Sequence, residues 1–506
     1  MDYPIWDLGM GGGLLMALVA IPHVIVSHFA IGGGLLIAVT ETLSVKRGDP
    51  ELRELAKRSS LMLILVSTVF GAISGVGIWV VAGLVAPGTI SALIHTYVWG
   101  WAIEWVFFVV EIVAALVYYT TWDKISKGAH LLVGWLYFIA AYLSLVIING
   151  IVTYMLTPGR WLETQAFWDG FFNPTYWPSL VLRTGICIMM AVAFMVFPAM
   201  RGAATDRDRI MRYLGKWMVA GALVSYAGYR WWEAMLPDTV NNLFRGSAPV
   251  LETLASTRHF LLWSLTAALV LAILILVAVP KLAKPATAVV LALAAFSFFG
   301  GYERLREGVR KPFLIHSYLF SNGLRVAEIP DVNASGVLAK AGWAGLAASE
   351  NPSSTGRQVF RAQCASCHTI DGYQGIRQLL PTVAGFRAVA ADGHAEFYEA
   401  TCASCHPDTS VDEMREMLPT PDEIDADPEF IAELNHGMIY GTLVRLSEMG
   451  DTYAAADHTR MIDTSGFDSP YMPPFVGTEE EMEALAGYLA GLVAEGPEQF
   501  AMKGGQ

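Results

Sequence analysis

The chain has 506 residues, 54% of them hydrophobic, and a mean hydropathy of +0.45. This composition excludes an ordinary water-soluble protein and indicates a membrane protein with a more polar part attached. From residue 351 onward there are 25 Asp and Glu against 8 Lys and Arg, a net charge of −17, whereas the whole chain carries −13. The acidic part argues against a nucleic acid partner and favours a basic protein partner.

Eight apolar runs are each long enough to cross a bilayer as a helix. The loops after the first, third, fifth and seventh runs are rich in Lys and Arg, and the other loops are poor in them. The positive-inside rule makes the odd-numbered loops cytoplasmic, so both termini lie outside. The predicted fold is an all-α, polytopic membrane helix bundle of about eight spans, followed by a C-terminal α-helical domain. The runs cover roughly residues 10–44, 60–86, 95–121, 130–157, 179–200, 213–235, 257–281 and 285–303.

The first run contains His23 and His28, followed by Gly32-Gly33-Gly34. A histidine inside a membrane span is costly, and each one is therefore a candidate functional residue. Residues five apart are separated by about 140° around a helix, so the two histidines cannot both face one iron. For each histidine the alternative stays open that its ring is only hydrogen-bonded to a neighbouring helix.

The third run carries Glu104 and Glu111, which are two helical turns apart and therefore share a face. Carboxyls stacked along a span suit a proton path; two neutral, hydrogen-bonded structural acids are the alternative. The eighth run ends in a charged segment, residues 303–310, that the topology places at the outer surface. These charges could pair with one another or with haem propionates, and a solvated helix end is the alternative.

Two C-x-x-C-H motifs follow, Cys364-Ala-Ser-Cys367-His368 and Cys402-Ala-Ser-Cys405-His406. This is the attachment signature of c-type haem. Thiols at positions i and i+3 lie on one helical face and can form thioethers to both haem vinyl groups, and the next residue supplies the proximal nitrogen. Two motifs in a chain with five cysteines predict two covalent haem c groups. A pair of zinc or disulfide sites is the alternative, and a four-thiol zinc site would leave both histidines unexplained.

Haem c is attached outside the cytoplasmic membrane, which agrees with the topology derived from the loop charges. The predicted domains are a membrane haem domain at 1–313, a linker at 314–352 and a dihaem domain at 353–506. The predicted location is the bacterial inner membrane, surrounded by lipid, with the last domain in the periplasm. Thr478 and Glu481 form a capping box that opens a C-terminal helix.

Residues 1–313 resemble subunit I of the cytochrome bd family of quinol oxidases through three motifs: His23 with Gly32-Gly33-Gly34, Glu104 and Glu111 before Trp122-Asp123, and Arg306-Glu307-Gly-Val-Arg310-Lys-Pro-Phe313. The resemblance implies that His23 and Glu307 ligate membrane haem and that Arg310 pairs with a propionate. It implies that Glu104 and Glu111 serve the haem pocket and proton delivery. It also implies haem b, with haem d as the alternative, and a subunit II-like membrane partner.

The chain departs from that family where the low-spin haem b is held. Arg183 stands where the family's histidine would fall, and the methionine partner is missing, with only His259 nearby. The large outer loop that binds quinol is reduced to roughly residues 236–256. We therefore expect the quinol-side electron entry to be dismantled and the inner haem pocket to be retained.

Residues 353–506 resemble class I cytochrome c, in which the C-x-x-C-H helix crosses a C-terminal helix and a Met-Pro-Pro segment supplies the distal sulfur. The resemblance makes Met472 the distal ligand of the first haem and His368 and His406 the proximal ligands. For the second haem we favour His436 as distal ligand. Met417, Met438, His458 and Met461 remain alternatives.

Three functions fit these features. The first is an oxidoreductase subunit, a bd-like terminal oxidase in which cytochrome c or another periplasmic protein feeds the c haems and the membrane haem reduces oxygen. The second is a non-oxidase electron-transfer subunit of a larger respiratory complex, exchanging electrons with quinone. The third is a haem-bearing anchor or sensor, against which the intramembrane Glu104 and Glu111 argue.

Overall fold

The structure is a computed structural model, and it describes residues 3–6, 8–201, 204–237, 240, 249–344, 352–372, 375–379, 410, 413, 428–454 and 472–503. The chain divides into two compact units, each of which is described by itself. The bundle unit comprises Leu18–Trp79 and Leu93–Arg310. The C-terminal unit comprises Met1–Ala17, Val80–Ala92 and Lys311–Gln506.

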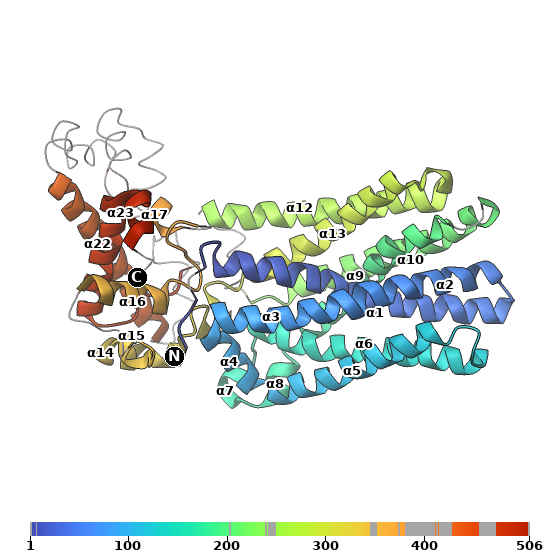
Figure 1. Ribbon diagram of the computed structural model, residues 1–506, viewed down its shortest axis with the longest axis horizontal. Helices are drawn as coiled ribbons and strands as arrows, with labels where there is room; N and C mark the ends of the chain where they lie inside the picture. The colour runs from blue at the N-terminus through green and yellow to red at the C-terminus, as the bar shows by residue number, and fades with distance from the viewer. Residues whose placement is uncertain are drawn as a thin grey trace. The chain divides into compact units, whose positions relative to one another are not determined.

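Long helices make up the bundle unit and run alongside one another (Figure 1). In the part of the chain that the structure describes, seven helical segments are long and apolar enough to cross a membrane: Gly12–Arg47, Pro50–Val85, Val98–Thr120, Lys127–Leu156, Tyr176–Ala199, Leu254–Ala278 and Pro285–Gly308. The predicted sixth run lies in an eighth long helix, Ala204–Ala234, whose last part carries Arg230 and Glu233 and is more polar. The predicted all-α membrane bundle is confirmed.

Almost all elements of the described residues are helical. Short segments connect the long helices, and two of the long helices contain a π-helical stretch. The bounds are α1 Gly12–Arg47, α2 Pro50–Leu63, η1 Ile64–Gly71, α3 Ala72–Val85, α4 Pro87–Thr96, α5 Val98–Thr120, α6 Lys127–Leu156, α7 Trp161–Thr164, α8 Phe167–Phe171, α9 Tyr176–Ala199, α10 Ala204–Ala234, α12 Pro249–Leu271, η2 Ala272–Ala278, η3 Pro280–Leu282, α13 Pro285–Gly308, β1 Phe313–Ile315, β2 Leu319–Phe320, η4 Val326–Glu328, α14 Ile329–Ser335, α15 Val337–Lys340, α16 Pro352–Gln363, α17 Ile376–Leu379, α22 Pro428–Ala454 and α23 Glu479–Lys503.

The glycine run of α1 permits close contact with two other helices. A Cβ atom on Gly32 would lie 1.8 Å from the backbone oxygen of Cys187 in α9. A Cβ atom on Gly34 would lie 2.4 Å from the ring of Tyr137 in α6. In membranes, where helices gain little from hydrophobic association, such small residues let backbones approach and pack. The run therefore sets how α1 sits against α6 and α9.

The C-terminal unit has its own apolar core, built mainly from α16, α22 and α23. The helices α16 and α23 cross closely, because a Cβ atom on Gly356 would lie 2.0 Å from the backbone oxygen of Ala484. Next to this crossing, the rings of Phe360 and Tyr488 lie 6.2 Å apart. The helices α16 and α23 thus pack against each other at a position without a side chain.

The predicted linker contributes to this core over its described residues. Strands β1 and β2 pair in an antiparallel hairpin, with Phe313 opposite Phe320. Ile329, Val332 and Val337, from the short helices that follow, are buried in the same core as α16 and α23. These apolar residues show no helical period because they are spread over two strands and several short helices.

The predicted capping box at the start of α23 is confirmed. The carboxylate of Glu481 accepts from the Thr478 nitrogen (3.2 Å), and the Thr478 hydroxyl accepts from the Glu481 nitrogen (3.2 Å). Glu481 also accepts from the nitrogens of Val337 and Leu338 at the start of α15, at 2.8 and 2.9 Å. One carboxylate therefore satisfies donors at the beginnings of two helices.

Candidate functional site

His23, from the first half of α1, is oriented by the second spanning segment. Its Nδ1 lies 3.2 Å from the carbonyl oxygen of Gly71 and 3.1 Å from the hydroxyl of Ser74. A carbonyl only accepts, so Nδ1 carries the proton and Nε2 keeps its lone pair. This is the arrangement of a metal-binding histidine, whose second ring nitrogen donates to a carbonyl.

Two local features of the second segment make room for this contact. Gly71 ends the π-helical stretch η1, and such stretches recur at functional sites because they disturb the regular hydrogen-bond ladder. One turn later, Gly75 lies against the imidazole, and a Cβ atom there would come within 3.0 Å of the ring. Neither residue could be singled out from the sequence, since neither a π-helical stretch nor a ring contact has a signal in a single apolar run.

His28 is held in a different way. Its Nδ1 donates to the Val24 carbonyl at 2.8 Å, and its Nε2 accepts from Arg183 of α9 at 3.3 Å. The ring is 3% exposed and lies 4.4 Å from the ring of Phe299 in α13. Both nitrogens of His28 are thus used within the protein, and the two histidines contact different helices.

Arg183 begins a row of buried and half-buried charges that ends at the C-terminus of α13. It forms an ion pair with Glu303 at 2.8 Å, and Glu303 pairs with Arg306 at 3.0 Å. Arg306 also pairs with Glu307 at 2.6 Å, and Glu307 pairs with Arg310. The structure therefore brings together Glu307 and Arg310, the predicted ligand and propionate partner.

One polar atom in this row of charges could donate a hydrogen bond to a bound cofactor. Arg306 and Arg310 are 7% and 3% exposed, and Nη1 of Arg306 is buried without a hydrogen-bond partner among the described residues. Buried guanidinium groups of this kind suit the carboxylates of a porphyrin. His259, by contrast, is exposed on α12.

Glu104 and Glu111 lie on one face of α5 and both meet α6. Ser144 donates to Glu104 at 2.9 Å. Tyr137 lies 3.1 Å both from Glu111 and from the carbonyl oxygen of Ala30 in α1. The two carboxyls are therefore hydrogen-bonded to different partners along the same helix pair.

The first C-x-x-C-H motif forms a helical turn directly after α16. The His368 nitrogen donates to the Cys364 carbonyl at 2.9 Å, and the Cys367 nitrogen donates to the same oxygen at 3.0 Å. The thiols of Cys364 and Cys367 are not joined in a disulfide. Burial, together with the neighbouring thiol, raises the pKa of Cys364 to about 12. Two unoxidised thiols on one turn next to a histidine fit thioether attachment of a haem.

Hydrogen bonds connect the segment that contains Met472 to the residue before this motif. Gln363, which immediately precedes Cys364, donates to the Val476 carbonyl at 2.6 Å and accepts from the Val476 nitrogen at 3.1 Å. Cys364 and Met472 are both half-buried and pack against the same apolar core. A single glutamine thus joins the predicted attachment site to the predicted distal ligand segment.

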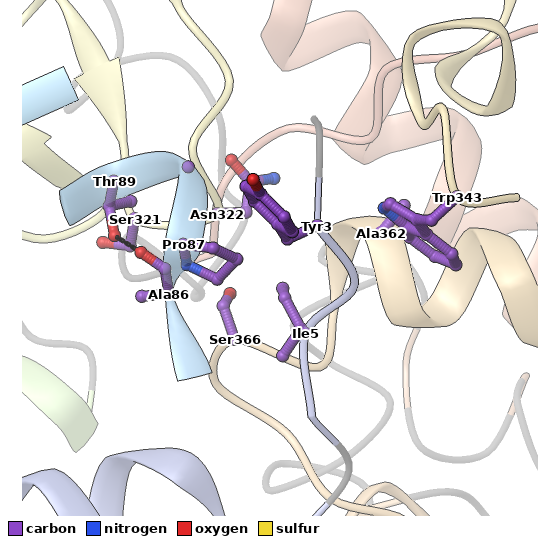
Figure 2. Close-up of a pocket in the computed structure, with 11 residues that line it drawn as sticks. Tyr3, Ile5, Ala86, Pro87, Thr89, Ser321, Asn322, Trp343, Ala362 and Ser366 are labelled. Atoms are coloured by element: carbon purple, nitrogen blue, oxygen red, sulfur yellow. Dashed lines mark hydrogen bonds between the residues drawn. The ribbon is translucent and has the colours of Figure 1, made fainter. Parts of the chain in front are cut away.

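A cavity borders the same motif on another side (Figure 2). Ser366, inside the motif, lines it together with Ala362, Tyr3, Ile5 and Pro87. Arg361 extends the contact with the N-terminal residues, because its Nη2 lies 3.4 Å from the Ile5 carbonyl. The N-terminal residues and the C-x-x-C-H turn therefore share one surface within the C-terminal unit.

The second motif, with Cys402, Cys405 and His406, lies outside the described residues, as do Met417, His458 and Met461. His436, on α22, lies 3.2 Å from the carboxylate of Glu483 and near the ring of Tyr440. Its assignment to the second haem remains a prediction.

The helical bundle defines a class of membrane fold that is known from solved structures. The chain is similar to a bd oxidase from Geobacillus thermodenitrificans, with a TM-score of 0.52 and 14% identity over 60% of this chain and 88% of that chain. At that identity the likeness shows the fold. The model of the family "Cytochrome bd terminal oxidase subunit I" matches residues 13–228. No curated protein sequence matched the chain. The membrane part is thus bd oxidase subunit I-like.

Proposed function

We propose that this protein is a respiratory electron-transfer subunit in which periplasmic c haems pass electrons to a haem in a bd oxidase subunit I-like bundle, for the reduction of oxygen. One observation carries the proposal: the Gln363–Val476 clamp joins a C-x-x-C-H turn to the Met472 segment in a chain whose other part has the bd oxidase fold. A bound haem would supply the one-electron chemistry.

In the bundle, His23 would hold the membrane haem through Nε2, since its Nδ1 is turned to Gly71. Glu307 would hold the same haem or the other haem of a pair, and Arg310 would face a propionate, in haem b or haem d. In the C-terminal unit, Cys364, Cys367 and His368 would hold the first haem c. Met472 would be its distal ligand. Cys402, Cys405 and His406 would hold the second haem c, with His436 as distal ligand.

Glu104 and Glu111 would carry protons to the membrane haem, because each has a hydroxyl partner on α6 within the span. The donor would be cytochrome c or another periplasmic protein, and a basic one would suit the acidic domain. The bundle would sit in the bacterial inner membrane with a subunit II-like partner.

A second candidate is a subunit that exchanges electrons with quinone and does not reduce oxygen. One observation bears on it: Arg183 is buried against His28 and Glu303 at the position where the family resemblance expects a haem-ligating histidine. Because Arg183 pairs with His28 and Glu303 and cannot ligate a haem, electron entry from quinol through a haem at this position is disfavoured. This observation favours electron entry through the c haems.

Oxygen uptake by the purified complex, with reduced cytochrome c as donor, separates the two candidates. Sustained uptake that stops in a His23→Ala variant supports the oxidase. Absence of uptake, in a preparation whose membrane haem is nevertheless reducible, leaves the electron-transfer subunit and eliminates the oxidase.

A further inference from the structure

A ladder of polar pairs runs along the interface of α5 and α6. On each helix three polar residues recur at intervals of seven, so they lie on one face. The first two pairs are the carboxyls of Glu104 and Glu111 with their hydroxyl partners. The third pair is Tyr118 with His130, whose rings lie 4.3 Å apart and whose imidazole Nε2 lies 2.9 Å from the Tyr118 carbonyl. The ladder from residue 104 to residue 118 covers about 21 Å of helix, most of the thickness of a bilayer core.

The third pair is completed by a carboxyl from a different helix. Glu41 of α1 is 3% exposed, as is His130. Its Oε1 lies 2.7 Å from His130 Nδ1, and its Oε2 accepts from the Tyr118 hydroxyl at 2.7 Å. Three titratable side chains from three membrane helices therefore meet in one buried cluster, which neither the sequence analysis nor the proposed haem site uses.

The hydrogen bonds fix how many protons this cluster holds. The Tyr118 carbonyl can only accept, so His130 Nε2 must carry a proton. The contact between Nδ1 and Glu41 then contains one further proton, which sits either on the imidazole or on the carboxyl. If that proton left without replacement, two lone pairs would face each other at 2.7 Å, which is unfavourable. The pair is thus built to hold one proton and to take up another whenever one is passed on.

The indole ring of Trp122 lies between this cluster and charged residues at the surface. The ring of Trp122 lies 4.2 Å from that of His130, and the guanidinium of Arg53 lies over the Trp122 ring at 5.1 Å from its centroid. Arg53 and Lys57 both pair with Asp123, at 2.5 and 3.0 Å. Hydrogen bonds from Lys57 and Arg53 lower the pKa of Asp123, so this exposed carboxylate stays ionised. Apart from these groups, the indole of Trp122 binds the Ser60 hydroxyl at 3.2 Å.

We propose that Glu41 and His130 form a proton-holding pair, which receives protons from the side of α1 that ends at Arg47 and passes them along the α5–α6 ladder. The proposal rests on the proposed function, because the ladder needs a proton-consuming site to serve. Successive pairs are about 10 Å apart along the helices, so transfer between them requires water. Each transfer moves one proton and leaves the pair ready for the next.

Glu41→Gln in the purified, vesicle-reconstituted complex tests this proposal. A glutamine keeps the structural bonds, since its oxygen accepts from Tyr118 and its amide donates to a neutral His130, but it cannot release a proton. With a pH-indicator dye we expect proton uptake on photochemical haem reduction to become at least about tenfold slower. The haem absorption spectrum should not change. The matched control is Glu54→Gln, which alters a surface carboxyl that pairs with Arg58.

Proton uptake at the wild-type rate in the Glu41→Gln complex overturns the proposal and leaves the proposed function standing. A wild-type complex without a reducible membrane haem overturns the function itself, and this proposal with it. If Glu41→Gln fails to assemble, dicyclohexylcarbodiimide, which modifies protonated carboxyls in apolar surroundings, decides the matter in the wild-type protein. An adduct on Glu41 with proportionate loss of proton uptake supports the pair, and absence of an adduct there overturns it.

Discussion

Arg183 donates to Nε2 of His28 across 3.3 Å, and this contact separates the roles of the two histidines of α1. The guanidinium occupies the ring nitrogen that an iron would need. His23 has only its Nδ1 engaged, by Gly71 and Ser74, so its Nε2 lone pair is oriented away from that contact. The spacing of the two histidines shows that they cannot share an iron, and the hydrogen bonds indicate which one can bind it.

The first prediction concerns these two histidines. We expect His23→Ala to lose one membrane haem per chain, because no other described residue of α1 offers an imidazole with an available Nε2. His28→Gln should keep that haem, since a glutamine oxygen can still accept from Arg183. The ratio of haem b and haem d to haem c, measured as pyridine haemochromes, checks both variants. Loss of the haem in His28→Gln and its retention in His23→Ala would assign the iron to His28 and contradict this prediction.

The second prediction concerns the close contact at Gly32. A methyl group there would overlap the backbone oxygen of Cys187, so Gly32→Ala must push α1 away from α9. We expect the free energy of unfolding to fall by roughly 1–3 kcal/mol, with a lower Tm in detergent. Gly13→Ala is the matched control, because nothing lies within 4 Å of that position and alanine favours the helix. Equal Tm values for the two variants would contradict the packing described here.

The third prediction is a pH dependence at the start of α2. Asp49 caps this helix, accepting from the nitrogens of Glu51 and Leu52, and it pairs with Arg209 of α10. The hydrogen bond from Arg209 lowers the pKa of Asp49 from its ordinary 3.8. A lowered folded-state pKa stabilises the protein above the ordinary value, and this stabilisation is lost as the pH falls through the folded-state value.

Asp49→Asn retains the helix cap and removes the charge, so its Tm should lie below that of the wild type at neutral pH. The difference should shrink as the pH falls below about 4. The free energy of unfolding of Asp49→Ala should be about 1 kcal/mol lower than that of Asp49→Asn at every pH, because alanine also removes the helix cap. A Tm difference between wild type and Asp49→Asn that grows on acidification would contradict this assignment.

The fourth prediction concerns the first haem c. We expect Met472→Ala to keep the covalent haem, because Cys364 and Cys367 are unchanged, but to lose the methionine-to-iron charge-transfer absorption of the ferric form. The reduction potential should fall, since a thioether ligand favours ferrous iron. Gln363→Ala should weaken the same absorption by releasing the Val476 backbone. An unchanged spectrum in Met472→Ala would assign the distal position to another residue.

Much of the bundle could be predicted from the sequence because long apolar runs identify membrane spans. The capping box at Thr478 was equally readable, since its two residues lie close together in the chain. The hydrogen-bond partners of buried side chains could not be predicted from the sequence. Arg183 and His28 are 155 residues apart, and Glu41 and His130 are 89 apart, so only the folded helices bring them together.

The predicted linker shows a second limit of sequence reasoning. Residues 313–340 carry buried apolar side chains without a regular period, because two short strands and several short helices share the task of covering one core. Periodicity detects long amphipathic elements and overlooks such segments. The π-helical stretch before Gly71 was overlooked for a related reason, since its residues are as apolar as those of the regular helix around it.

The order in which the haems accept electrons tests the central claim most directly. Oxidised complex is mixed rapidly with reduced cytochrome c in the absence of oxygen, and the absorption bands of haem c and of the membrane haem are followed together. Electron entry through the c haems predicts that haem c is reduced first and that the membrane haem follows, with the second phase missing in His23→Ala. Reduction of haem c alone in the wild-type complex, or of the membrane haem before haem c, would contradict it.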